Sequence, residues 1–419
     1  MVSVMREMKD SGAYWVGDIP SHWAVGRIDS FYRLRNTKVS DEDYQPLSVT
    51  KEGVLPQLET AAKTNSHDDR KLVRKGDFAI NSRSDRRGSC GISPYDGSVS
   101  LINTILAPKG EMNPEYYDWL FHTIQFGDEF YRWGHGIVDD LWTTNYQDMK
   151  KINIPVPPIE EQKSIALYLN KECAEIDSLS ADIQSEIETL ETYKRSVITE
   201  AVTKGLDKNV PMKDSGIEWV GEIPEYWGVH PVHYYFGERK NKNYALQEQN
   251  LLSLSYGKII RKDIDTLGGL LPASFNTYNI VEAGDIIIRP TDLQNDKRSL
   301  RTGLVHEKGI ITSAYIDLAP KGNINSAYFH YLLHSYDVQK VFYNMGNGVR
   351  QGLNYSEFAK LLVFAPSRKE QDEIVSYLSD TCAEIESVIA QKQEQLAVLA
   401  EYKKSVIYEY VTGKKEIII

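Results

Sequence analysis

The sequence is short of cysteine, of long apolar runs and of positive charge. Its three cysteines, Cys90, Cys173 and Cys382, are far apart, which excludes a disulfide framework and a Cys-x-x-Cys metal site. No stretch approaches the roughly 18 apolar residues of a membrane span, and the opening MVSVMREMKD lacks the apolar core of a signal peptide. We therefore expect a cytoplasmic protein without a membrane partner.

Acidic residues outnumber basic ones, but the excess is unevenly distributed. The 419 residues include 48 Lys and Arg against 59 Asp and Glu, a net charge of −11 that at face value argues against a nucleic-acid partner. Residues 159–205 hold five basic and ten acidic residues, and residues 367–419 hold seven and ten. These two segments account for −5 and −3, so the rest of the chain is close to neutral and contains basic clusters.

The chain is a tandem repeat of two copies. MKDSGAYWVGDIPSHW at 8–23 and MKDSGIEWVGEIPEYW at 212–227 are identical at 11 of 16 positions. The motif CAEI also recurs, at 173–176 and 382–385. The first part of each copy varies in sequence and length, whereas the last 46 or so residues align without a gap, so one part of the repeat varies and the other is constant.

Each copy is predicted to combine a compact domain with one long helix. The variable parts mix short β-type runs with turn signals and one short aromatic helix, a pattern typical of α+β domains. The constant parts follow proline-rich breaks and contain no proline, which predicts a helix of roughly 70 Å at 1.5 Å per residue. We predict an α+β fold of two globular domains and two long helices, with boundaries at 1–158, 159–207, 208–366 and 367–419.

Apolar residues in the two predicted helices recur every seven positions, which indicates a coiled coil. Lys392 interrupts the stripe where Ile183 stands in the first copy. Each helix ends where the domain of the other copy begins, so we expect an antiparallel pair with pseudo-two-fold symmetry and the chain termini brought together. The predicted coiled-coil core consists of Cys173, Ile176, Ile183, Ile187, Leu190 and Val197 in the first helix, and Cys382, Ile385, Ile389, Leu396, Leu399 and Val406 in the second.

These features resemble the specificity subunits (HsdS) of Type I restriction–modification systems. The resemblance rests on the doubled opening MKDSG-x2-WVG-x-IP-x2-W, on the turns into the helices at 154–162 and 364–371, and on the helix endings YKRSVI (193–198) and YKKSVI (402–407). It covers nearly the whole chain, in the order of target-recognition domain and conserved helix, twice.

The resemblance implies a DNA-reading subunit that is not an enzyme. Each target-recognition domain would read one half of a bipartite, asymmetric site in double-stranded DNA. The helices would set the spacing of the two halves and dock two methyltransferase (HsdM) subunits, and restriction-translocase (HsdR) subunits are possible further partners. S-adenosylmethionine, ATP and Mg²⁺ would belong to those partners, so no cofactor or metal is expected on this chain.

The predicted DNA-contacting side chains lie mainly in polar loops that follow a repeated Gly-Asp-β segment. Arginine in such loops contacts phosphates or guanine, and glutamine or asparagine suits adenine. A second candidate loop, bounded by glycines, precedes each long helix. The alternatives are a solvated loop with local ion pairs in the first case and a turn that docks the domain onto the helix in the second. The candidates are Lys71, Arg74, Arg83, Arg86 and Arg87 in the first copy and Arg289, Lys297, Arg298, Arg301, Arg350 and Gln351 in the second.

Four tryptophans, Trp15, Trp23, Trp219 and Trp227, recur unchanged in both copies. Groups that read different bases should differ between the copies, so we interpret these tryptophans as packing anchors. The rival to a DNA-reading function is a coiled-coil scaffold or adaptor whose two domains bind protein. Salt-dependent DNA binding would separate the two hypotheses, because phosphate contacts release counterions.

Catalytic interpretations are weaker. The Pro-Pro dipeptide before the first helix lacks the flanking residues of the (N/D)PP(Y/F) motif of adenine methyltransferases. Glu161 and Lys163 match a nuclease pattern only loosely, and acidic residues are favourable at a helix start in any case. His330 and His334 have the spacing of a metal-binding pair on a helix, but no HExxH glutamate accompanies them.

Overall fold

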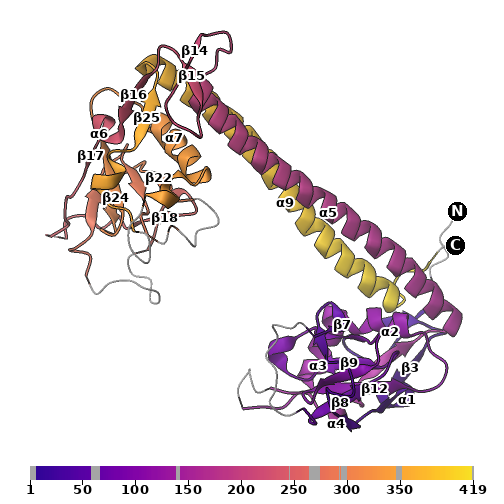
Figure 1. The fold of residues 1–419 in the computed structure, drawn as a ribbon. Coiled ribbons are helices and arrows are strands. Elements are labelled where there is room, and N and C mark those ends of the chain that lie inside the picture. The colour runs from indigo at the N-terminus through magenta and orange to yellow at the C-terminus, as the bar shows by residue number, and fades with distance from the viewer. Residues whose placement is uncertain are drawn as a thin grey trace. The chain divides into compact units, whose positions relative to one another are not determined.

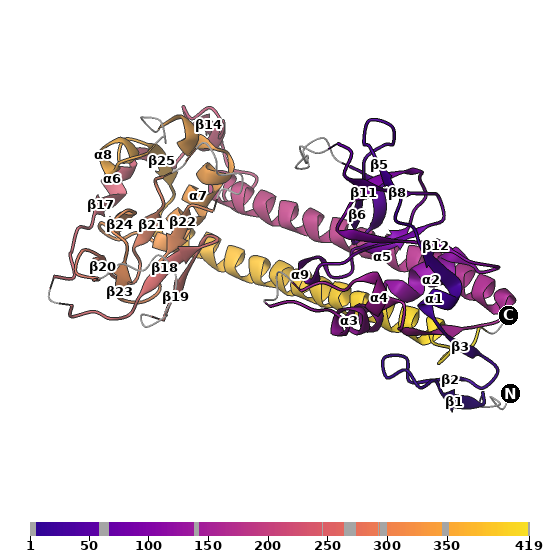
Figure 2. The ribbon, with the colours of Figure 1, turned by 90° about the horizontal axis from the view of Figure 1, so that it is seen from below.

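The chain divides into two compact units, residues 1–184 with 393–419 and residues 185–392. This computed structural model describes residues 6–57, 67–137, 142–244, 246–263, 274–291, 293, 300–345 and 352–417. Each unit contains one variable domain together with a part of both long helices (Figures 1 and 2). We call the described residues up to 158 head 1 and those from 208 to 366 head 2. The unit boundaries therefore fall within the two long helices, whereas the sequence-based boundaries fall at the ends of the helices.

Head 1 is an α+β domain around a four-stranded antiparallel sheet with the order β10-β9-β12-β4. A second sheet, β11-β8-β5, and the pairs β1-β2, β3-β13 and β6-β7 complete it. Its helices are α1 (Ile28–Phe31), the 3-10 turn η1 (Ser84–Arg86), α2 (Pro114–Phe121), α3 (Ile124–Arg132) and α4 (Tyr146–Met149). Its strands are β1 (Met8–Asp10), β2 (Asp18–Pro20), β3 (Ala24–Arg27), β4 (Tyr32–Leu34), β5 (Lys38–Val39), β6 (Leu47–Thr50), β7 (Gly53–Pro56), β8 (Arg70–Val73), β9 (Phe78–Asn81), β10 (Cys90–Ile92), β11 (Gly97–Ser100), β12 (Asn103–Pro108) and β13 (Asn153–Val156).

Head 2 repeats this topology, with the central sheet β22-β21-β24-β17 in the place of β10-β9-β12-β4. One continuous helix, α7 (Ser326–Val338), takes the place of α2 and α3. The other helices are α6 (Val232–Tyr235), the 3-10 turn η3 (Val341–Asn344) and α8 (Tyr355–Phe358). The strands are β14 (Met212–Asp214), β15 (Glu222–Pro224), β16 (Gly228–Pro231), β17 (Phe236–Glu238), β18 (Leu252–Ser255), β19 (Lys258–Arg261), β20 (Asn279–Val281), β21 (Ile286–Ile288), β22 (Thr302–Leu304), β23 (Gly309–Ile311), β24 (Ile316–Pro320) and β25 (Leu362–Ala365).

Aromatic side chains dominate the core of each head. Trp23 and Trp227, from the repeated opening, are 1% and 0% exposed, as expected of packing anchors. The predicted aromatic helix is present in both copies, and an asparagine caps it each time. The side chain of Asn113 accepts a hydrogen bond from the backbone of α2, and that of Asn325 does the same for α7, which satisfies N–H groups that a helix start leaves open.

The two long helices are α5 (Ile159–Lys204) and α9 (Arg368–Val411), 46 and 44 residues long. They pair antiparallel within each unit. In the first unit Lys403 Nζ lies 2.6 Å from Asp177. In the second unit Lys194 is paired with Glu386, and Lys392 with Glu186. The lysine that interrupts the apolar stripe therefore has an acidic partner on the facing helix.

The heptad positions form the buried seam between the helices. Cysteine thiols on this seam are shielded, and burial raises the pKa of Cys173 to about 11 and also raises that of Cys382. The buried members are Cys173, Ile176, Ile183, Ile187, Val197, Cys382, Ile385 and Val406, and the half-buried ones are Leu190, Ile389, Leu396 and Leu399.

The C-terminal end of α9 packs into head 1. Val406 and Val411 belong to the hydrophobic core of this head, and the hydroxyl of Tyr116 donates a hydrogen bond to the Val411 carbonyl at 2.8 Å. Past the helix, Lys414 Nζ donates to the Val16 carbonyl at 2.6 Å. The end of the chain thus meets the repeated opening, as the repeat predicted. Within the described ranges, no helix is both long and apolar enough to cross a membrane.

Candidate nucleic-acid interface

A buried aspartate anchors the strand that leads into each basic loop. Asp77, just before β9, accepts hydrogen bonds from Arg35 Nε at 2.5 Å and Nη2 at 3.0 Å. Asp285, just before β21, accepts the same pair from Arg239 at 2.7 and 3.0 Å. A bidentate, charge-assisted pair is geometrically specific, so it fixes where the strand starts. Neither arginine is among the predicted site residues, although each follows the second tryptophan of the doubled opening by 12 residues.

The basic loop of head 1 follows β9 and contains the turn η1. Arg83, Arg86 and Arg87 are all exposed on it. Arg87 is held in place, because its Nη1 donates to Asp128 at 3.0 Å and its guanidinium lies 5.2 Å from the ring centre of Tyr131. Exposed ion pairs of this kind contribute little to stability, so these guanidinium groups can exchange their present partners for phosphate oxygens.

The two candidate loops of head 1 lie side by side. The Thr144 amide donates to the Ser82 carbonyl at 2.9 Å, and Arg83 forms an isolated β-bridge with Thr143. The loop after β9 and the loop before α4 therefore contribute to one surface. The sequence predicted both loops as candidates for DNA contact, and in head 1 the structure brings them together.

The same two loops are joined in head 2. The Leu353 amide donates to the Pro290 carbonyl at 2.9 Å, which links the segment after β21 to the segment before α8. The bond stands where the Thr144–Ser82 bond stands in head 1. Four predicted contact residues of this head lie outside the described residues: Lys297, Arg298, Arg350 and Gln351.

Arg301 requires a correction. The residue is 0% exposed, and its Nη1 donates to the carbonyls of Arg289 and Thr291 at 3.2 and 2.6 Å. Its backbone amide donates to Asp337 at 2.8 Å. A side chain in this position cannot meet DNA at the surface, so Arg301 closes the base of the loop from inside. Arg289, at the start of the loop, is half-buried.

Lys71 and Arg74 are also engaged within head 1. Lys71 Nζ donates to the Asn103 carbonyl at 2.7 Å, and burial lowers the pKa of this half-buried amine. Arg74 Nη1 lies 2.8 Å from Asp96, and its guanidinium lies 5.5 Å from the ring centre of Tyr44. The role of these two residues in DNA contact stays a prediction, whereas Arg83, Arg86 and Arg87 share the surface of the paired loops.

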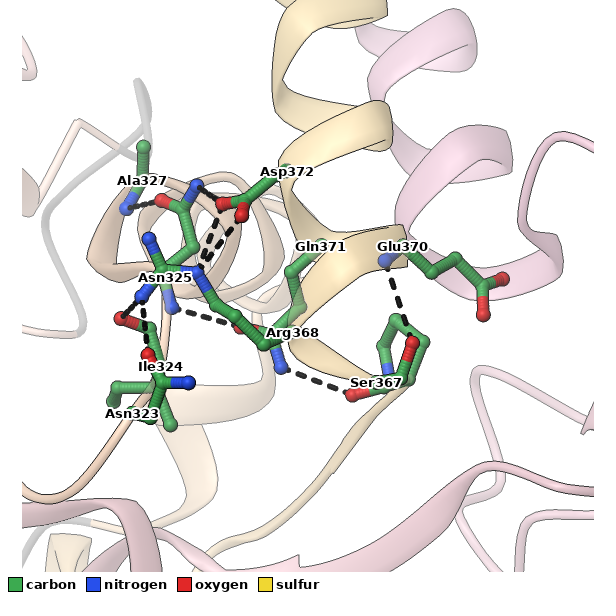
Figure 3. A network of polar contacts seen from close by, with 10 residues as sticks. Asn323, Ile324, Asn325, Ala327, Ser367, Arg368, Glu370, Gln371 and Asp372 are labelled. Carbon is green, nitrogen blue, oxygen red and sulfur yellow. Dashed lines mark hydrogen bonds and ion pairs between the residues drawn. The ribbon is translucent and has the colours of Figure 1, made fainter.

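A glutamine at the start of each long helix locks the helix to its head. In head 2, shown in Figure 3, Gln371 accepts a hydrogen bond from the Asn325 amide at 2.8 Å and donates to the Pro366 carbonyl at 3.0 Å. Asp372 accepts from the Asn325 side chain at 2.6 Å and pairs with Arg368 at 2.9 Å. The N-terminus of α7 and the start of α9 are thereby tied together.

Head 1 has the same lock. Gln162 accepts from the Asn113 amide and donates to the Pro157 carbonyl, both at 2.9 Å. Beside it, Glu161 accepts from the Trp23 indole at 2.9 Å, and Glu370 accepts from Trp227 at 3.2 Å in the same way. The repeated Glu-Gln pair thus forms the joint between head and helix, and it includes Glu161, the acidic residue of the loose nuclease match.

The histidine pair of α7 lies against the core. Burial lowers the pKa of both His330 and His334 to about 4. The charge of His334 lowers the pKa of His330 further, and the charges of Lys194 and Arg195 lower that of His334. In the part of the chain that the structure describes, no group of three or more His, Cys, Asp or Glu side chains is arranged to hold a metal ion.

The described residues thus form one α+β frame twice, and a glutamine joins each copy to the start of a long helix. Residues 20–189 match the family model of the Type I restriction modification DNA specificity domain. The chain is 27% identical over 434 aligned positions to the putative type I restriction enzyme MjaX specificity subunit of Methanocaldococcus jannaschii, covering 95% of each chain. It is 23% identical to the MjaVIII specificity subunit of the same organism, covering 94% of this chain and 93% of that one.

Solved structures show the same fold. A chain from a study of complex assembly and conformational transition of the type I R-M system aligns with a TM-score of 0.72 at 12% identity, over 95% of this chain and 99% of that one. The HsdS subunit of Thermoanaerobacter tengcongensis aligns with a TM-score of 0.53 at 14% identity, over 95% and 98%. Residues 20–189 therefore match the specificity-domain family, and nearly the whole chain is similar to Type I restriction enzyme specificity subunits. Specificity subunits of these systems are non-catalytic.

Proposed function

We propose that the two heads each read one half of a bipartite, asymmetric site in double-stranded DNA. The observation that carries this proposal is the hydrogen bond that joins the two candidate loop segments in each head, from Thr144 to Ser82 in head 1 and from Leu353 to Pro290 in head 2. The contacts that anchor the strand before the first loop, from Asp77 to Arg35 and from Asp285 to Arg239, are the same in both copies. A constant support beneath a variable surface is the arrangement that reading two different half-sites requires.

In head 1 the surface offers the chemistry that DNA contact needs. Arg86 and Arg87 have side chains that are 67% and 61% exposed, and arginine serves both phosphate and guanine contacts. Asn145 and Gln147, at the start of α4 in the neighbouring loop, are exposed as well. Amide side chains of this kind suit adenine. The proposed reading surface of head 1 thus combines positive charge with base-selective polar groups.

The paired helices are proposed to set the spacing of the half-sites and to dock two methyltransferase (HsdM) subunits. Restriction-translocase (HsdR) subunits would join the same complex. The helices hold most of the negative charge of the chain, so they suit a protein partner better than a phosphate backbone. S-adenosylmethionine, ATP and Mg²⁺ are proposed to act on those partner subunits. Because the proposed target is the DNA of the cell, we place the protein in the cytoplasm.

The decisive experiment is to express the chain with its methyltransferase partner and to map methylated adenines across the genome of the host. We expect methylation at one two-part sequence with a fixed spacer. If the two proteins form no complex, or if methylation shows no bipartite site, the proposal is wrong. A protein-binding scaffold would instead form complexes whose affinity for DNA neither depends on sequence nor falls steeply with salt.

A further inference from the structure

The last turns of α5 border a cavity that DNA reading does not use. It has a volume of about 260 Å³ and lies within the second compact unit. The helix supplies one wall, which includes Thr199 and Lys204. The turn between β14 and β15, part of the repeated opening, supplies the other wall with Trp219 and Val220 (Figure 1). All of the lining residues belong to α5 or to this turn.

In the first unit a tyrosine occupies the matching place. The helix endings SVITEAVT and SVIYEYVT align without a gap, so Tyr408 of the second copy is the counterpart of Thr199 of the first. The hydroxyl of Tyr408 donates to the carbonyls of Trp15 and Val16, at 3.0 and 3.1 Å. These two residues are the counterparts of the tryptophan and the valine that line the cavity. The tyrosine ring therefore fills in the first unit the space that stays open in the second.

The cation beside this space is present in both units. In the first unit Lys414 Nζ lies 4.8 Å from the ring centre of Tyr408 and donates to the Val16 carbonyl at 2.6 Å. In the second unit Lys204 Nζ donates to the Val220 carbonyl at 3.4 Å. A carbonyl oxygen has two lone pairs, and Val16 accepts from both Lys414 and Tyr408. The Val220 carbonyl can likewise accept a second donor.

The tryptophan beside the cavity lacks contacts that its counterpart has. Trp15 is 7% exposed, whereas Trp219 is half-buried. The indole Nε1 of Trp15 donates to the Asn153 carbonyl at 3.0 Å. Within the described ranges, the indole Nε1 of Trp219 is buried without a hydrogen-bond partner. The second unit therefore leaves aromatic area uncovered where the first unit covers it with a ring.

The walls define the chemistry of a group that would complete the cavity. An aromatic ring would cover the indole of Trp219 and lie close to the ammonium of Lys204, a favourable cation–π arrangement. A hydroxyl on that ring would donate to the Val220 carbonyl. A phosphate is disfavoured, because Glu200 also lines the cavity and α5 is acidic overall. The cavity thus suits a phenol group, which in a protein is the side chain of tyrosine.

Resting on the docking function proposed above, we propose that this cavity receives a tyrosine side chain of the methyltransferase subunit that docks on the second unit. The cavity lies on α5, one of the two helices that the proposed function assigns to docking. The ring of the partner would make there the contacts that Tyr408 makes within the first unit. Buried tyrosines are common anchors of protein interfaces. The two docking sites of the chain then differ, because only the second is open to a ring from the partner.

The first measurement uses the full chain alone with p-cresol, the analogue of a tyrosine side chain. A titration followed by saturation-transfer NMR should show one saturable site, with a dissociation constant on the order of 1 mM. Thr199→Tyr should remove this site, because the new ring fills the cavity as Tyr408 fills its counterpart. Thr199→Val is the matched control. It loses the same hydroxyl, which lies 3.4 Å from Ser335 Oγ, but leaves the cavity open and should bind p-cresol as wild type does.

The second measurement follows assembly of the complex. Methyltransferase subunits are titrated onto the full chain, and native mass spectrometry counts the subunits bound. We expect Thr199→Tyr to weaken one of the two docking steps roughly tenfold to a hundredfold and to leave the other unchanged, whereas Thr199→Val should assemble as wild type does. Thermal melting checks that both variants fold. Competition by p-cresol should weaken the same step in the wild type, a measurement that needs no variant.

The outcomes separate the site, its occupant and the proposed function. A wild-type chain without a saturable p-cresol site, or a site that persists in Thr199→Tyr, overturns the cavity as a phenol site. If Thr199→Tyr removes the p-cresol site and assembly stays unchanged, the methyltransferase is not the source of the ring, and the proposal is wrong. If the wild-type chain binds no methyltransferase, the proposed docking function fails, whatever the cavity binds.

Discussion

Head 1 and head 2 share the same central sheet, but one buried position of that sheet is apolar in head 1 and carries a carboxyl group in head 2. Ile105 pairs with Ala79 across the sheet of head 1, and Asp317 pairs with Ile287 at the matching place in head 2. Ile105 is 0% exposed within an aliphatic cluster. Asp317 is 1% exposed, and burial, followed by the charge of Asp285, raises its pKa to about 8. The frame therefore accepts a carboxyl in its interior when the group keeps its proton.

The pKa values of two equivalent histidines also differ between the heads. His122 and His334 share a repeat position at the end of α2 and within α7. Burial alone would lower the pKa of His122, but contacts with Cys90 and with Asp118 raise it to about 10. The pKa of His334 falls to about 4. One head buries a cation with acceptors and the other buries a neutral ring, so the heads differ in their interior as well as in their loops.

The largest effect should come from lengthening the two paired helices, α5 and α9. Inserting seven residues at matching points of α5 and α9 adds roughly 10 Å of helix, which equals about three base pairs at 3.4 Å each. We expect methylation of the original site to be lost and both half-sites to be kept with a spacer longer by about three base pairs. Mapping of methylated adenines measures this. An unchanged spacer would show that the helices do not set the distance.

Exchanging the buried residues tests whether the interiors are really different. Ile105→Asp should destabilise head 1 by about 3 kcal/mol or more, because no partner compensates the buried group. Asp317→Asn should stabilise head 2 by about 1–3 kcal/mol at pH 8, since the amide needs no proton. Urea unfolding, monitored by hydrogen exchange in each head, measures both changes in the free energy of unfolding. Destabilisation by Asp317→Asn at pH 8 would contradict the raised pKa.

Removing the exposed arginines of one head should affect one half-site only. Arg83→Ala with Arg86→Ala is expected to weaken binding on the order of 100-fold, at about 1–3 kcal/mol for each lost contact. Methylation should then tolerate changes in the half-site of head 1 and still require the other half. Arg27→Ala serves as control, because Arg27 is also exposed and pairs with a local aspartate, Asp29. Equal relaxation of both half-sites would refute independent reading.

The last comparison concerns the response of the two heads to pH. The pKa values of His330 and His334 lie near 4 in the folded chain and near 6.5 in an unfolded one. As pH falls from about 6.5 to 4 the unfolded chain binds protons that head 2 refuses, so head 2 loses up to about 2 kcal/mol for each histidine.

His122 in head 1 has the opposite sign. Its raised pKa means that its contribution is complete below about pH 6.5 and is lost as pH rises toward 10. Hydrogen exchange should show that protection of head 2 is lower at pH 5 than at pH 7, whereas protection of head 1 is the same at both pH values. Replacing both α7 histidines with glutamine should abolish that acid response, and a response that persists would assign it to other groups.

The architecture was largely predictable because the pattern that specifies it is local. The heptad repeat and the absence of proline predicted a long helix within 159–207, and α5 spans Ile159–Lys204. The asparagine before each aromatic helix acts as its cap in both copies. Duplication doubled each signal, because the same feature recurs after about 209 residues.

The interface was harder to predict because burial is decided by packing between distant segments. Arg301 has the sequence surroundings of an exposed loop arginine, yet its guanidinium is turned inward to backbone carbonyls. Arg35 lies 42 residues from the aspartate that it holds, and sequence spacing does not reveal such a pair. The neighbouring position of the two candidate loops in head 1 likewise depends on tertiary contacts, the Thr144–Ser82 hydrogen bond and the Arg83–Thr143 bridge.

The glutamine lock has a consequence for how such a gene changes over generations. Gln162 and Gln371 each grip their own head through backbone groups alone, an asparagine amide and a proline carbonyl. A head exchanged by recombination within the repeated segments would bring the asparagine of its own helix cap, and the resident glutamine would bond to it unaltered. The coding sequence can therefore exchange one head for another while the glutamine contacts that join head and helix stay the same.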